Sequence, residues 1–164
     1  MDRLDFHALY ERHSGDVLRF ALYLSGNLKE AEDIAAETFA RAWTATDEIR
    51  TATVKAYLFA IVRNLVRESA RRDRGQAEVV EEHADPGPGP AAAADGRMQL
   101  RAVLTALQQL PEADRAALLM RAQDGMSHEE IAATLGLSVV AVRVRIHRAR
   151  LALNTLKIRE ERKP

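Results

Sequence analysis

The chain has 164 residues, with 24 basic and 24 acidic side chains, so its formal net charge is zero. It contains no cysteine, which excludes disulfides, thiolate catalysis and cysteine-based zinc sites. The first residues carry several charges and no apolar run long enough for a signal peptide or a membrane span. We therefore expect a cytoplasmic protein with no membrane insertion.

Apolar residues recur at intervals of three and four through the first half, without strand patterns, so an all-α fold is predicted. Residues 5–25 are expected to form two helical stretches, broken near Ser14 and Gly15. Asn27 is a suitable N-cap for the next helix, which ends near Thr44. One face of that helix is small and apolar, and the other carries Glu30, Asp33, Glu37 and Arg41.

A third helix, over about residues 54–72, has an apolar face and a basic face. The residues on or at the edge of the basic face are Tyr57, Arg63, Asn64, Arg67 and Arg71. Together with the nearby Phe59, they offer phosphate contacts and groups that stack on or hydrogen-bond an unpaired base. This pattern indicates a DNA surface; the alternative is an ordinary solvent face with its aromatic rings in the core.

Residues 76–97 are predicted to be a flexible linker. Three of the five prolines lie in the run EEHADPGPGPAAAADG, and residues 76–99 contain five acids and one arginine, a local net of −4. Such a stretch cannot recover its ordering entropy by burying apolar surface. The predicted domains are therefore residues 1–75 and 98–164, free to move independently, and each is small and helical.

Residues 127–150, SHEEIAATLGLSVVAVRVRIHRAR, are typical of a helix-turn-helix. Ser127 and Glu130 form a potential capping box at the start of the first helix. Gly136 permits the tight turn, and Ser138 can cap the second helix.

The second helix of this motif combines an apolar stripe with clustered basic residues. Val142, Ile146, Ala149 and Leu153 are expected to be buried, leaving an exposed surface that is almost wholly cationic. From Ala141 to Lys163 there are eight Arg or Lys and two Glu, a local net of +6. Such clustering is typical of a helix that binds DNA phosphates. The residues predicted to contact DNA are Ser138, Val139, Val140, Arg143, Arg145, His147, Arg148 and Arg150.

No enzymatic constellation is present in the sequence. The five histidines have no metal-ligand spacing, and no phosphate loop or nucleophile motif occurs. We expect no catalytic residues, no metal and no cofactor.

Taken together, the chain resembles the extracytoplasmic-function (ECF, group IV) sigma factors of bacterial RNA polymerase. The N-terminal half is similar to sigma region 2 through AEDIAAETFARAW and YLFAIVRNLVRESARR. The second half is similar to region 4 through LPEADR, GMSHEEIAATLGLS and VRVRIHRARLAL. The resemblance implies a transcription initiation factor that directs core polymerase to promoters.

Roles for the charged residues follow from the resemblance. It implies that Asp33, Glu37 and Arg41 dock on the clamp helices of the polymerase β′ subunit. It also implies that the chain contacts the β flap of the polymerase. The basic face of the third helix and the loop 46–53 would engage and help open the −10 element, and the helix after Ser138 would read the −35 element. An anti-sigma factor is a further expected partner.

One segment departs from the family pattern. A Gly-Thr-Val-Lys-Ser run is usual after the cap of the reading helix, and here residues 140–144 are Val-Ala-Val-Arg-Val. Fewer hydroxyls face the groove, and apolar contact with thymine methyl groups is one replacement for the lost hydrogen bonds. The main alternative function is a two-domain helix-turn-helix regulator that acts without core polymerase.

Overall fold

The computed structural model describes residues 3–45, 53–75 and 91–162, and every regular element in these ranges is an α-helix. The first domain contains α1 (Arg3–Ser25), α2 (Leu28–Thr44) and α3 (Val54–Gly75). The second contains α4 (Ala91–Gln108), α5 (Glu112–Ala122), α6 (His128–Leu135) and α7 (Val139–Glu161). The predicted all-α fold is confirmed.

The expected break in the first helix is wrong, because Ser14 and Gly15 lie inside the continuous α1. Val17, Phe20, Ala21 and Leu24, the residues that follow, are fully buried on this helix. Their packing outweighs the roughly 1 kcal/mol that a glycine costs within a helix.

The core of the first domain forms where α1, α2 and α3 meet. Phe20 of α1 stacks on Phe59 of α3, with ring centroids 4.3 Å apart and an interplanar angle of 8°. The start of α2 is fixed by the predicted cap, since the Asn27 side chain accepts a 3.0 Å hydrogen bond from the Glu30 amide. The apolar face of α2 buries Ala31, Ile34, Thr38, Phe39 and Ala42, which leaves its charged face outside.

The last seven residues of the predicted linker are helical. Residues 91–97 form the first turns of α4, and residues 76–90 lie outside the described residues. The alanine run 91–94 has the strongest intrinsic helix propensity, and the helix it begins continues to Leu107, which is buried in the core.

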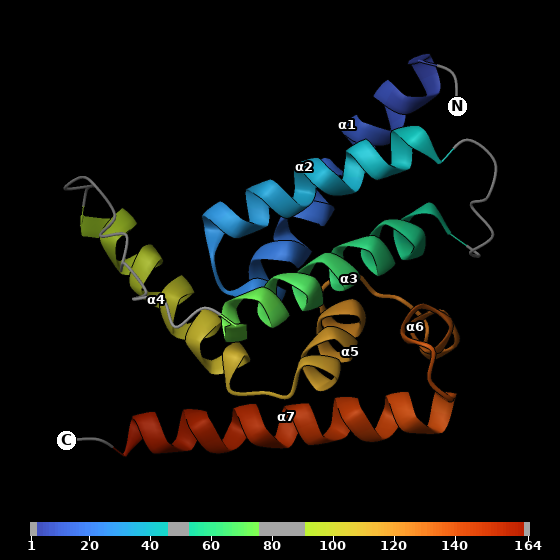
Figure 1. Cartoon of the computed structure of the whole chain (residues 1–164). Helices are drawn as coiled ribbons and strands as arrows, with labels where there is room; N and C mark the ends of the chain where they lie inside the picture. Colours follow the sequence, from blue (N-terminus) through green and yellow to red (C-terminus); the bar gives the residue numbers. More distant parts are fainter. Residues whose placement is uncertain (1–2, 46–52, 76–90, 163–164) are drawn as a thin grey trace.

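The two domains pack against each other in this structure. Helix α1 contacts α4 and α5, and α3 contacts α6, while α5 lies between α7 and the first domain (Figure 1). Within the described residues, no helix is long and apolar enough to cross a membrane.

Candidate DNA-binding and polymerase-binding surfaces

The helix-turn-helix is built by the caps and the turn that the sequence predicts. The Ser127 hydroxyl accepts a 3.1 Å hydrogen bond from the Glu130 amide, and the Ser138 hydroxyl accepts one of 3.1 Å from the Ala141 amide. Gly136 ends α6 with φ of 67°, in the left-handed region that disfavours a side chain. Ser127 fixes the start of α6, and Gly136 and Ser138 form the turn from which α7 begins.

Helix α7 buries most of the expected stripe, with Val142, Ile146 and Ala149 inaccessible or nearly so and Leu153 only partly buried. The expectation of an almost wholly cationic outer surface is wrong. Val140, Val144 and Leu151 are 69%, 50% and 54% exposed and form a row along the outer side. Successive residues of a helix are rotated by about 100° around its axis. This rotation places the arginines of α7 on the two sides of the apolar row and not within it.

The predicted DNA-contacting residues of α7 differ in their exposure. Ser138, Arg143, His147, Arg148 and Arg150 are exposed, as is Val140. Val139 is instead partly buried and packs against the core. It is therefore better placed to anchor the start of α7 than to reach a base.

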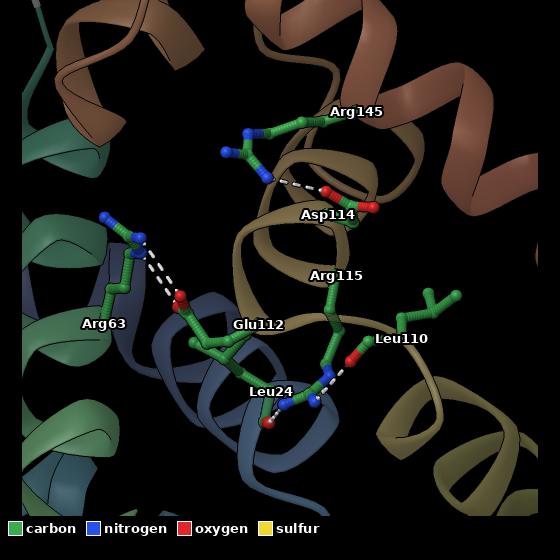
Figure 2. A network of polar contacts seen from close by, with 7 residues as sticks. All are labelled: Leu24, Arg63, Leu110, Glu112, Asp114, Arg115 and Arg145. Carbon is green, nitrogen blue, oxygen red and sulfur yellow. Dashed lines mark hydrogen bonds and ion pairs between the residues drawn. The ribbon is translucent and has the colours of Figure 1, made fainter.

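Two arginines of α7 are held by a buried acid of α5. Asp114 Oδ1 accepts hydrogen bonds from Arg145 Nη1 at 2.9 Å and from Arg148 Nη2 at 3.2 Å, and its side chain is only 3% exposed. Figure 2 shows the Arg145 contact between the two helices. A guanidinium has five N–H donors, so each arginine retains donors for phosphates while Asp114 fixes its direction.

The basic face of α3 is only partly open. Asn64, Arg67 and Arg71 are exposed, and Tyr57 is partly buried against the core. Arg63 forms a bidentate ion pair with Glu112 of the second domain, with Nε–Oε1 2.8 Å and Nη2–Oε2 3.0 Å (Figure 2). In this packed arrangement, Arg63 does not face solvent with the other basic residues of α3. Phe59 is fully buried, which confirms for this residue the alternative that the aromatic rings of α3 belong to the core.

The charged face of α2 is accessible. Asp33 and Glu37 are exposed, and Glu37 Oε1 accepts a 3.0 Å hydrogen bond from Arg41 Nε. Arg41 also lies 3.9 Å from the Glu68 carboxylate on α3. The three predicted polymerase-binding residues thus share one open surface.

Arg115 of α5 joins the domains from a buried position. Its guanidinium donates to the carbonyl of Leu24 in the first domain at 2.6 Å, and to those of Leu107 and Leu110 at 2.9 Å. Figure 2 shows it between Leu24 and Leu110. Burial lowers the pKa of Arg115, although the nearby Glu112 opposes the shift. The sequence pattern does not predict this role; the available signal is that Arg115 directly precedes the apolar residues Ala116–Met120 of α5.

A second polar contact between the domains centres on Asp124, which precedes α6. Its side chain is 1% exposed, and its nearest cations are Arg19 and Lys55 of the first domain, each 3.7 Å away. Those cations are closer to Asp16, at 2.8 and 3.0 Å. Among the described residues, neither Asp124 oxygen has a hydrogen-bond partner within bonding geometry, and burial raises the pKa of this carboxyl.

The fold and these surfaces define a two-domain helical DNA-binding protein, and comparison with known proteins gives its family. Residues 9–76 match sigma-70 region 2, and residues 100–153 match sigma-70 region 4. The chain is 35% identical over 150 residues to the ECF RNA polymerase sigma factor SigE of Mycolicibacterium smegmatis, covering 88% of this chain and 58% of that protein. It is 33% identical over 142 residues to EcfG of Rhodopseudomonas palustris, covering 84% and 76% respectively.

Solved structures give the same family. CnrH in complex with the cytosolic domain of CnrY has a TM-score of 0.72 and 30% identity, covering 94% of this chain and 88% of CnrH. RpoE with the anti-sigma factor NepR, from Bartonella quintana, has a TM-score of 0.72 and 27% identity, covering 93% and 96%. The chain belongs to the ECF RNA polymerase sigma factors, a non-enzymatic family that directs RNA polymerase to promoters.

Proposed function

We propose that this sigma factor makes four contacts, two with the polymerase and two with the promoter. The α2 face of Asp33, Glu37 and Arg41 docks on the β′ clamp helices, and the second domain meets the β flap. The basic face of α3 contacts the −10 element, and α7 reads the −35 element. The observation that carries this proposal is that α3 and α7, with their exposed basic residues, lie in the segments that match sigma regions 2 and 4.

The proposed −10 surface consists of Tyr57, Arg63, Asn64, Arg67 and Arg71. The exposed Arg67 and Arg71 would bind phosphates, and Asn64 offers an amide to an unpaired base. Arg63 joins this surface only after its ion pair with Glu112 breaks.

The chain cannot contact the −10 and −35 elements at the same time while its two domains remain packed together. Positions −10 and −35 are about 25 base pairs apart, or about 85 Å at 3.4 Å per base pair. A compact chain of this size has a radius of gyration of only about 15 Å. The domains must therefore separate, and residues 76–90, which we propose as the linker, span up to about 50 Å when extended.

An anti-sigma factor is a further proposed partner. Each of the two structural relatives described above was solved with a partner protein. RpoE is bound to the anti-sigma factor NepR, and CnrH is bound to the cytosolic domain of CnrY. A partner that stabilises the packed arrangement would keep Arg63 away from DNA. We also propose that the chain acts in the cytoplasm, where the polymerase works.

The surfaces are tested by footprinting the holoenzyme on a promoter selected from a library. Alanine at Arg67 and Arg71 should weaken protection near −10 while protection near −35 persists. Alanine at Arg143 and Arg150 should have the opposite effect. Equal loss over both elements for either pair would contradict the assignment of one helix to one element.

A further inference from the structure

The outer row of α7 contains exposed apolar side chains on a helix that binds DNA. Val140 and Val144 are 69% and 50% exposed and lie one turn apart near the start of α7. Within the part of the chain that the structure describes, Val142 belongs to the core and Val139 packs against it, whereas Val140 and Val144 are in neither group. They are therefore available to a ligand that presents apolar groups.

The arginines around the two valines indicate how α7 approaches that ligand. At about 100° per residue, Val140 and Val144 point within roughly 40° of each other, with Arg143 on one side and Arg148 on the other. Both arginines are exposed, and Arg148 is directed by its contact with Asp114. A helix with cations on both flanks fits between the phosphate backbones that border a major groove, and its middle row then faces the bases.

The chemistry of a valine limits what it can read there. The thymine 5-methyl is the apolar group on the major-groove edges of the four base pairs. A valine placed against the cytosine amine would remove water from a donor without supplying an acceptor. The N-terminal part of a recognition helix usually reaches base edges, and both valines lie in that part.

We propose that Val140 and Val144 are specificity-determining residues that contact thymine methyl groups in the −35 element. This inference rests on the proposed assignment of α7 to that element. Each methyl contact should change affinity about fourfold, the factor that corresponds to burying one methyl group. Arg143 then binds the DNA beside them, at a phosphate or a base, while the valines set a preference for thymine.

The test uses holoenzyme assembled from core polymerase and the full chain. A promoter library randomised over the upstream element is selected first, and each enriched thymine is then replaced by deoxyuracil, which lacks only the methyl group. Wild-type affinity should fall about fourfold at the contacted positions. Val140→Ser and Val144→Ser should each abolish that sensitivity at a different position. Both sites are exposed, so circular dichroism should be unchanged.

Leu151→Gln is the matched control, because Leu151 is 54% exposed on the same row but lies two turns further along the helix. It should retain the full sensitivity to deoxyuracil. If wild-type affinity is indifferent to the methyl group at every position, or both valine variants keep the wild-type pattern, the proposal is wrong and the row faces another partner. Absence of any upstream selection by the wild type would overturn the −35 assignment of α7 and this proposal with it.

Discussion

The ion pair between Arg63 and Glu112 should control whether the two domains stay packed. Its side chains are only 13% and 28% exposed, and both guanidinium contacts are 3.0 Å or shorter. A hydrogen bond to a charged group contributes about 1.5–3 kcal/mol, and breaking a fully buried pair costs about 3–5 kcal/mol. For this partly exposed pair we expect Glu112→Gln to cost about 2 kcal/mol, or about thirtyfold in the ratio of packed to separated chains.

The absence of cysteine makes this ratio measurable by single-molecule fluorescence transfer. Dyes attached through Ala40→Cys in the first domain and Lys157→Cys in the second would occupy exposed positions. Wild-type chains should show high transfer, and Glu112→Gln should enlarge the low-transfer population. Glu32→Gln is the matched control, since Glu32 is an exposed acid on α2.

A double-mutant cycle separates this ion pair from general effects of charge. Arg63→Gln combined with Glu112→Gln should separate the domains little more than the larger single change does. Strictly additive effects, or a packed population that none of the three variants alters, would refute the reasoning.

Three further outcomes are expected. Lysine at both Asp33 and Glu37 should weaken core binding at least tenfold in a fluorescence titration with unchanged circular dichroism, since both are exposed; unchanged affinity would remove α2 from the interface. Burial raises the pKa of Asp124, so the native state binds more protons than the unfolded state and loses stability as pH rises through that raised pKa. In urea titrations, the stability of Asp124→Asn relative to wild type should therefore rise as pH increases above 3.8, the ordinary pKa of the aspartate, and level off once pH passes the raised pKa; a difference that is constant with pH would contradict this. Arg150→Ala should reduce the slope of log affinity against log salt by about 0.9 for all upstream sequences, whereas a sequence-selective effect would make Arg150 a base reader.

Local patterns in the sequence were sufficient to predict α2, α3, α6 and α7. Asn27, Ser127 and Ser138 cap the helices they were expected to cap, and Gly136 has the left-handed conformation that the turn needs. Caps depend on residues three positions apart, so a sequence displays both partners. The break expected at Gly15 was wrong because its outcome depends on packing against distant helices.

Contacts between domains could not be predicted in the same way. Arg63 and Glu112 are 49 residues apart, and neither residue type indicates which partner it will meet. The same holds for Arg115 and the carbonyl of Leu24, which are 91 residues apart. The exposed apolar row of α7 could have been predicted from the helical positions of its valines. The number of arginines in this helix indicated a cationic surface instead, although the valines lie between them. The assignment of site residues to polymerase and promoter stays a prediction.

The most direct test of the central claim is transcription in vitro with purified core polymerase and the full chain on a promoter library. We predict that the chain will start transcripts at fixed positions, from templates that share an upstream and a downstream element at constant spacing. The variant with lysine at Asp33 and Glu37 should start none of them at matched concentration. If the wild-type chain bound these templates without core polymerase and added no transcripts in its presence, the account would be contradicted.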